Sequence, residues 1–469
     1  MNNSSQSTKT SIGIEKRSVE FIPLDERKGS SRELFGIWFG FNMIPLALIT
    51  GAIGVASGLS FWWSVLAITI GALLGGITMG LHASQGPKLG VPQMLQARGQ
   101  FGSQGAGLLT IIVLLVIIGF FVSNLVVAAQ SLILAVPEIS TVHAILFATL
   151  TSLVITTVGY SLVRYLSSVT AWVVGAVLLL IAAEAIFNIG NYPTITEAGD
   201  FTVAAFFMMM MISASWLIGF APYVSDYSRY MAPDSDEVAA FWGTYLGCTL
   251  GAVATMIVGA FLASQIAAGD PLAALKENYG FTGVSVLVIF FVASSLVNCI
   301  NSYTATLSIL TLLKGMFPKL HVSSSIRISA IVVFHIIAFF MATAASEDFL
   351  TIFIDFILFL IYFLVPWSAI NLVDYFLIKK GEYDIDSFFK AGGGIYGRWN
   401  GNAMMIYGFA MLFEFPFMNT SLYAGSMVDL LGGVDIAWIV GFISAGFLYY
   451  LTNKNKKQVM NYSSSMSSK

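Results

Sequence analysis

Long apolar stretches separated by short polar clusters run through most of this chain. Runs of about 18 or more apolar residues are typical of bilayer-spanning helices, which need about 20 residues each. The alternating pattern of a membrane β-barrel is absent. The pattern therefore predicts an all-α integral membrane protein with twelve transmembrane helices, near residues 34–58, 61–83, 105–134, 142–158, 162–187, 203–225, 240–266, 282–314, 326–345, 349–372, 403–420 and 433–452.

Basic residues divide unevenly between the two sides of these predicted helices. If the N-terminal tail lies on one side, every Lys and Arg except Lys276 falls on that same side. Loops rich in Lys and Arg stay in the cytoplasm. The asymmetry predicts a multi-pass protein of the cell membrane with both termini cytoplasmic, and with residues 1–33 and 453–469 as its tails.

Composition narrows the class of protein further. Of the 469 residues, 57% are hydrophobic and only 10% are charged, which is far from the balance of a soluble enzyme. A formal net charge of −3 argues against a nucleic-acid partner, because phosphate binding needs clustered Lys and Arg. Cys248 and Cys299 lie in apolar stretches and offer no disulfide framework or zinc site. With no metal-ligand cluster, phosphate loop or nucleophile–base pair in the sequence, neither enzymatic activity nor a cofactor is expected.

Two of the apolar stretches are interrupted by Gly and Pro together. The first is Gly40-Phe41-Asn42-Met43-Ile44-Pro45, and the second is Gly219-Phe220-Ala221-Pro222. If helices one to five (34–187) and six to ten (203–372) form an inverted repeat, followed by two further helices (403–452), the two interruptions occupy corresponding positions. Unwound backbone at mid-membrane is tolerated only beside a cavity, so such pairs indicate a transporter's binding site. The alternative is that Gly and Pro merely kink these helices.

Several amide side chains lie within the predicted helices, where an unpaired polar group is costly. An Asn offers two donors and an acceptor, which suits the N–H and C=O edge of a planar heterocycle. Aromatic rings nearby can stack on such a ring. The alternative is that each Asn joins two helices by a hydrogen bond. The candidate substrate-binding residues are Asn42, Phe120, Asn124, Trp216, Gly219, Phe220, Asn298, Asn301 and Ser302.

At these residues the sequence resembles the purine–cytosine permease family, which comprises nucleobase:cation symporters. The resemblance covers nearly the whole chain after about residue 30. It implies a leucine-transporter-type fold, in which a 5+5 inverted repeat is followed by two C-terminal helices. The stretches that carry it are residues 38–43, 85–94 with Arg98, Phe101 and Gly102, 221–230, 371–377, 396–398 and 432–436.

The resemblance also implies a substrate pocket among helices one, three, six and eight. Carried onto this sequence, the amide and aromatic positions of helix three fall on Phe120 and Asn124, and those of helix eight on Asn298 and Ser302. The family often has Trp in place of Phe120 and Asn in place of Ser302, and both departures leave the identity of the base open. For the aromatic residue of helix six, Trp216 is the first choice, with Phe220 as the alternative.

The coupling ion is expected to be a proton. Sodium-coupled relatives use two adjacent hydroxyl side chains just before the first Asn of helix eight, and here Leu296 and Val297 occupy those positions. Aliphatic side chains supply no oxygen to a hard cation. Ser294 and Ser295 would restore a sodium site if the alignment shifted by two residues.

A proton carrier must titrate within the membrane or at its edge. Burial of a carboxyl group favours its protonated form, which suits this task. Glu184 and Asp355 are the first candidates because they lie near the outer ends of helices that correspond across the repeat, and Glu414 and His335 are further candidates. The alternative is that the two carboxylates are interfacial groups in contact with water.

These observations predict a secondary active transporter that imports a nucleobase, such as cytosine or a purine, together with a proton by alternating access. The alternative within this class is a sodium-coupled transporter of a related ring compound: allantoin, hydantoin, uracil or thiamine. A channel is the alternative from another class, and the sparse charges disfavour the polar lining it needs.

Overall fold

The computed structural model describes residues 20–455 except 159, 193, 194, 196–199, 233–236, 268, 317–322 and 391. Most of the two predicted tails, residues 1–19 and 456–469, lies outside the described residues. The described residues form helices, with only two isolated β-bridges between them.

Helices are present at all twelve predicted places. They are α1 (Ser31–Phe41) with α2 (Pro45–Ala56), α3 (Phe61–Ala83), α6 (Arg98–Ala135), α7 (Thr141–Val158), α8 (Tyr160–Phe187), α10 (Val203–Ile218), α12 (Glu237–Ala263), α13 (Pro271–Met316), α14 (Ser324–Ala345), α15 (Phe349–Leu372), α17 (Gly401–Glu414) and α18 (Ala437–Asn453). Shorter elements connect them: α4 (Gln85–Leu89), α5 (Gln93–Gln96), α11 (Ser225–Ser228), α16 (Ile385–Phe389), the π-helical turn η4 (Val373–Ile378) and several 3-10 turns.

Membrane-spanning character is clear from length and apolarity. Among the described residues, eight helices are long and apolar enough to cross a membrane, and a ninth span results if α1 and α2 count as one bent helix. Two shorter apolar helices lie at Thr141–Thr157 and Ala437–Asn453. The protein is therefore an all-helical, multi-pass membrane protein, in agreement with the predicted class.

The first predicted interruption is a sharp break between α1 and α2. The two helices meet at an angle of 63°. Pro45 begins α2, and the residue before it, Ile44, is extended with φ −135° and ψ 149°. A proline ring clashes with a helical residue before it and has no N–H to donate, so the helix must restart at this point.

The second interruption is milder than the first. Helix α10 ends at Ile218, and a 3-10 turn (Ala221–Tyr223) and the one-turn helix α11 follow. Gly219 and Phe220 keep right-handed backbone angles, and no bend comparable to that between α1 and α2 occurs here. The physical reason is that Pro222 lies at the start of the 3-10 turn. A backbone N–H at that position would have no acceptor within the turn, so a proline there breaks no hydrogen bond.

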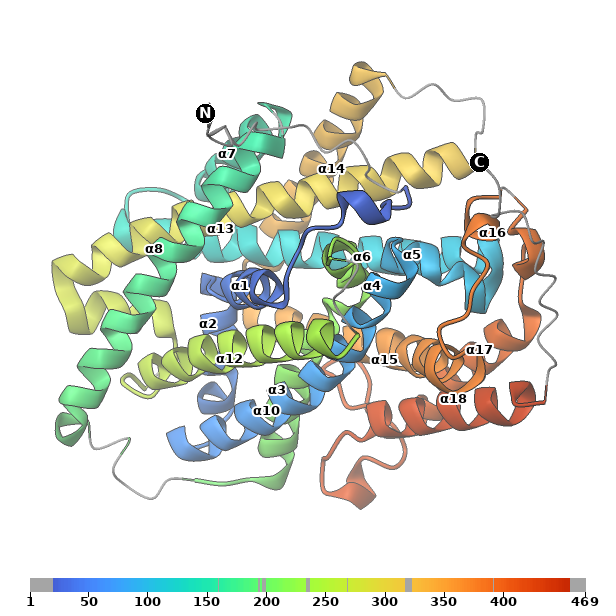
Figure 1. Cartoon of the computed structure of the whole chain (residues 1–469). Helices are drawn as coiled ribbons and strands as arrows, with labels where there is room; N and C mark the ends of the chain where they lie inside the picture. The colour runs from blue at the N-terminus through green and yellow to red at the C-terminus, as the bar shows by residue number, and fades with distance from the viewer. Residues whose placement is uncertain are drawn as a thin grey trace, which may run out of the picture.

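Apart from α8, which packs mainly against α13, the long helices pack in three groups (Figure 1). Helices α1, α2, α3, α10 and α12 pack closely together, as do α6, α7, α13 and α14, and α15 packs with α17 and α18. Small residues allow the close approach within the first group. Gly71 and Gly75 on α3 lie directly against the backbone of Met210 and Ala214 on α10. The candidate site residues lie where the first two groups meet.

Candidate functional site

The candidate site is built from the break after α1, the middle of α6, the end of α10 and the middle of α13. Asn42 ends α1; Phe120 and Asn124 lie one turn apart on α6. Trp216 lies in the last turn of α10, and Gly219 and Phe220 follow it. Asn298, Asn301 and Ser302 share a face of α13, being three and four residues apart.

A hydrogen bond joins the two interrupted helices. The Trp216 indole donates its Nε1–H to Oδ1 of Asn42 at 2.7 Å, and Asn42 donates Nδ2–H to the carbonyl of Trp38 at 2.8 Å. Both Asn42 and Trp216 are fully buried. Because the amide and the indole satisfy each other, the Asn42 side chain fixes the orientation of the Trp216 ring.

Aromatic rings from three helices meet beside this bond. Phe120 packs edge-on against Trp216, with ring centroids 5.6 Å apart, and lies parallel to Phe220 at 6.1 Å with an interplanar angle of 7°. Gly219 faces the same ring, since a β-carbon there would lie 3.3 Å from the Phe120 edge. Phe356 of α15 contacts Phe120 edge-on at 5.3 Å. Phe356 was missed in the sequence, where it is one of many aromatic residues in an apolar run.

The amides of α6 and α13 lie next to these rings. Asn298 donates Nδ2–H to the carbonyl of Phe121 on α6 at 2.9 Å, and its Oδ1 accepts a long bond of 3.4 Å from Asn301. Asn124 donates to the carbonyl of Phe120 at 2.9 Å. Among the candidate site residues, two buried side-chain atoms have no hydrogen-bond partner, Oδ1 of Asn124 and Oγ of Ser302. Buried polar atoms normally have partners, so these two are available to a ligand.

The aromatic rings set a geometric requirement for a bound heterocycle. Stacking contacts place ring planes about 3.5 Å apart, so a flat ring held between Phe120 and Phe220 needs about 7 Å between their planes. Their centroids are 6.1 Å apart. A centroid distance is the upper limit of the distance between two parallel planes, so inserting a base between them requires the rings to separate by at least about 1 Å, through motion of side chains on α6 and beyond the end of α10.

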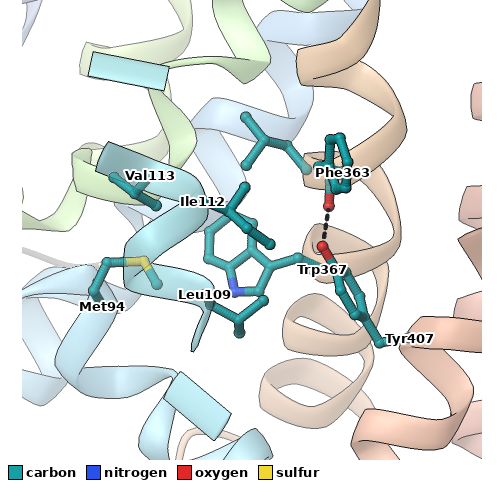
Figure 2. A pocket seen from close by; sticks show the side chains of 8 residues that line it. Met94, Leu109, Ile112, Val113, Phe363, Trp367 and Tyr407 are labelled. Carbon is teal, nitrogen blue, oxygen red and sulfur yellow. Dashed lines mark hydrogen bonds between the residues drawn. The ribbon is translucent and has the colours of Figure 1, made fainter. Parts of the chain in front are cut away.

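Two cavities lie outside this cluster. The first, about 10 Å³, lies between α5, α6, α15 and α17 and is lined by apolar side chains and by Trp367 and Tyr407 (Figure 2). It has room for no more than about one water molecule. The second, about 380 Å³, is an open depression between the end of α13 and the start of α14, lined by Ile309 and Ser325 among others. Neither cavity is lined by a candidate site residue.

The proton-carrier candidates Glu184 and Asp355 both have hydrogen-bond donors. Glu184, near the end of α8, accepts from the hydroxyls of Tyr192 at 2.5 Å and Tyr279 at 2.9 Å. Asp355 on α15 accepts from the backbone N–H of Ser421 at 2.9 Å and from the Ser421 hydroxyl. The two carboxyls therefore tie helix ends to the loops that follow α8 and α17.

The positions relevant to sodium lie on α13, just before Asn298. Leu296 and Val297 supply no side-chain oxygen. The hydroxyl of Ser295 donates to the carbonyl of Phe291 in its own helix at 2.8 Å, whereas the buried hydroxyl of Ser294 has no hydrogen-bond partner.

A second polar cluster, around Asp374 in the π-helical turn η4 that continues α15, was not singled out as a site in the sequence. Asp374 accepts hydrogen bonds from Tyr383 at 2.6 Å, Tyr449 at 2.9 Å and Gln100 at 3.2 Å. Burial raises the pKa of the Tyr383 phenol well above its ordinary value, so this phenol remains a donor at neutral pH. The cluster joins α6, α15 and α18.

Comparison with solved structures places this chain in the leucine-transporter-type class of folds. The chain superimposes on Mhp1 in its inward-facing conformation with a TM-score of 0.74, at 18% identity and covering 93% of both chains. Mhp1, a nucleobase-cation-symport-1 family transporter, in a closed conformation with bromovinylhydantoin bound, gives 0.73 at 17% identity over 94% of both chains. A Na⁺-coupled sialic acid symporter gives 0.60 at 13% identity, over 92% of this chain and 91% of that one.

Sequence comparison defines the family within that class. Residues 21–441 match the family described as "Permease for cytosine/purines, uracil, thiamine, allantoin". The "Putative purine-cytosine permease YxlA" of Bacillus subtilis is 35% identical over 97% of this chain and 99% of its own. The purine-cytosine permease fcyB of Emericella nidulans is 23% identical over 93% and 88%, respectively. This chain belongs to the purine-cytosine permease, or nucleobase-cation-symport-1, family, and is a transporter rather than an enzyme.

Proposed function

We propose that this protein imports a nucleobase, such as cytosine or a purine, across the cell membrane together with a proton. The coarser statement, a nucleobase permease, follows from the family to which the chain belongs. The more specific statement, which names the residues that bind the base, rests on the cluster of aromatic and amide side chains. Its members in this proposal are Asn42, Phe120, Asn124, Trp216, Gly219, Phe220, Asn298, Asn301 and Ser302.

Two buried, unpartnered polar atoms carry the proposed site: Oδ1 of Asn124, one turn from Phe120 on α6, and Oγ of Ser302, one turn from Asn298 on α13. Oδ1 of Asn124 accepts hydrogen bonds, and the hydroxyl of Ser302 both donates and accepts. A nucleobase edge presents N–H and C=O groups that pair with such atoms, while its face stacks on Phe120, Phe220 or Trp216. A ligand of this shape satisfies both atoms, and an apolar ligand would leave them unpaired at a cost of about 1–3 kcal/mol each.

Proton coupling is supported by the chemistry of α13. A sodium ion needs several oxygen ligands, and the aliphatic side chains at Leu296 and Val297 provide none. Glu184 and Asp355 are the carriers in this proposal. Glu184 accepts a hydrogen bond from the Tyr192 hydroxyl and Asp355 from the Ser421 hydroxyl, so uptake of a proton by either carboxylate would change its contact with a loop.

The proposed mechanism is alternating access by twelve membrane helices. Helices within residues 34–187 and 203–372 would form the inverted repeats, 403–452 the last two helices, and both termini would face the cytoplasm. The packing supports a rocking motion, because contacts within the α1–α2–α3–α10–α12 group and within the α6–α7–α13–α14 group are more extensive than contacts between them. The aromatic cluster lies at the junction of those groups.

The experiment is uptake of radiolabelled cytosine and hypoxanthine in cells that lack their own carriers, with an uncoupler and with sodium removal as separate arms. Saturable accumulation that unlabelled bases compete away and an uncoupler abolishes supports the proposal. Accumulation that stops only without sodium contradicts proton coupling, and uptake that never saturates indicates a channel. Transport without chemical reaction predicts that the labelled substrate is recovered from the cells chemically unchanged.

A sodium-coupled carrier of a related ring compound (allantoin, hydantoin, uracil or thiamine) is the second candidate. The buried, unpartnered hydroxyl of Ser294, two residues before Leu296, favours it. The likeness to a structure with bromovinylhydantoin bound supports the same class of ligand. Including hydantoins and allantoin in the competition panel separates this candidate from the first.

A further inference from the structure

A buried acidic residue lies outside the candidate site, at the end of α17. Glu414 is fully buried, and neither of its carboxyl oxygens has a hydrogen-bond partner. In the part of the chain that the structure describes, no other Asp or Glu has both oxygens buried and unpartnered. An ionised carboxylate without donors in such a place is strongly destabilised, whereas the un-ionised acid loses far less on burial.

Other buried carboxylates of this protein have the donors that Glu414 lacks. Asp435, in the segment before α18, accepts from the Tyr362 hydroxyl, from Asn419 N–H at 2.7 Å and from Ala437 N–H at 2.8 Å. Three donors stabilise a negative charge on Asp435. Glu414 has no such donors, so of these two acids Glu414 is the one whose burial leaves a negative charge unstabilised.

Among the residues that the structure describes, three ionisable groups face Glu414. They are Asp435 from the segment before α18, Tyr362 from α15 and Tyr407 from α17 itself. None of these carries a positive charge. The described residues also hold no group of three His, Cys, Asp or Glu side chains that suits a metal ion. The surroundings therefore favour a proton over a metal cation as the species that neutralises Glu414.

The carboxyl group of Glu414 occupies a space that only a glycine leaves open. A β-carbon added at Gly441, in the first turns of α18, would coincide with the Glu414 carboxyl. Helices α17 and α18 pack closely along this contact. An ionised Glu414 would need water or donors that this packing leaves no room for, so the packing and the un-ionised state require each other.

We propose that Glu414 is a proton-binding site, occupied at neutral pH, whose proton is required for the close packing of α17 against α18. The site is separate from the candidate substrate site and from the coupling role proposed for Glu184 and Asp355. Its ligand is a single proton. This proposal does not depend on which solute the protein transports.

The first test is infrared spectroscopy of the purified protein in detergent at about pH 7. The difference spectrum of the wild type minus Glu414→Gln is expected to contain the C=O stretch of an un-ionised carboxylic acid, with the downward shift in D₂O that identifies this group. The matched control is Asp355→Asn, whose carboxylate has donors, and the acid band is expected to persist in that variant. An ionised-carboxylate band in place of the acid band in the wild-type-minus-Glu414→Gln spectrum would overturn the proposal.

The second test is thermal unfolding in detergent across a range of pH. The unfolded chain ionises Glu414 as the pH rises above about 4.3, whereas the folded chain keeps the proton. Stability is therefore lost as the pH rises, and the folding equilibrium of the wild type should fall by up to tenfold per pH unit relative to Glu414→Gln. A difference between the two proteins that does not change between about pH 5 and pH 8 would contradict the proposal.

The role of the proton in packing is tested with glycine substitutions on α18. Gly441→Ala is expected to displace the Glu414 carboxyl, and so to weaken the acid band and lower the melting temperature. Gly446→Ala is the matched control, because a β-carbon there meets only ordinary contacts, at 3.5 Å with Val373 and 3.8 Å with Ala369. Equal effects of the two substitutions on band and melting temperature would show that Glu414 has no special part in this interface.

Discussion

Replacing Asn298 with Ala tests the proposed substrate site most directly. The Asn298 side chain is fully buried on α13, where its Nδ2–H bonds to the Phe121 carbonyl at 2.9 Å and its Oδ1 receives only a long bond of 3.4 Å from Asn301. The substitution removes one hydrogen bond between helices and one poorly satisfied acceptor. Its effects on folding and on substrate binding are therefore expected to differ in size.

The expected effect on the fold is small. A side-chain hydrogen bond between membrane helices contributes about 0.6 kcal/mol on average, so the melting temperature should fall by no more than about 2–4 °C. The expected effect on binding is larger. If Asn298 pairs with a base in a site that excludes water, the substitution leaves a polar group of the base unpaired, which weakens binding by about 1–3 kcal/mol. That corresponds to a dissociation constant about 5- to 150-fold higher.

The assay is substrate binding and uptake by purified protein in proteoliposomes, with melting temperature measured on the same preparations. Asn402→Ala is a suitable control, since Asn402 on α17 also bonds across to a neighbouring helix, to Thr452 at 3.0 Å, and lies outside the site. Asn402→Ala should bind substrate normally. Normal binding by a folded Asn298→Ala protein would refute the reasoning and remove Asn298 from the site.

Three further predictions concern the rings and the coupling ion. Trp216→Ala should weaken base binding by about 1–3 kcal/mol, measured by equilibrium binding; an unchanged affinity would transfer the stacking role to Phe220. Gly219→Ala places a β-carbon 3.3 Å from the Phe120 ring, so it should raise KM for uptake without lowering the amount of folded protein, and an unchanged KM would mean that the ring need not move there. Glu184→Gln and Asp355→Asn should abolish uncoupler-sensitive accumulation while leaving exchange of labelled for unlabelled base, and full accumulation by both variants would exclude them as proton carriers.

The sequence predicted the helices well because the signal for a membrane helix is local. The predicted ranges 61–83 and 349–372 coincide with α3 and α15, and the other ten predicted ranges also contain helices. A backbone in lipid must satisfy its own hydrogen bonds, so an apolar run of sufficient length has one structure available to it. The break before Pro45 was predictable for the same reason, since a proline acts on its immediate neighbours.

The residues around Pro222 did not by themselves determine how sharply the chain bends at the second break. Gly219 and Pro222 give nearly the same signal as Gly40 and Pro45, yet only the first pair lies at a 63° bend. The outcome depends on where the proline falls relative to the end of the preceding helix. It also depends on the element that contains the proline: Pro45 begins the long helix α2, whereas Pro222 lies in a short 3-10 turn that leads into the one-turn helix α11.

The sequence by itself determined the class of protein and the positions of its helices, and it predicted a set of residues for binding a flat polar ligand. Tertiary structure alone decided that Trp216 bonds to Asn42, that Phe356 joins the rings around Phe120, and that Glu414 has no donor while Asp355 has two. Asp355 and Glu414 give the same signal in the sequence, a single acid in an apolar helix. Their partners come from residues distant in the chain, and the free energy of a buried charge depends on those partners.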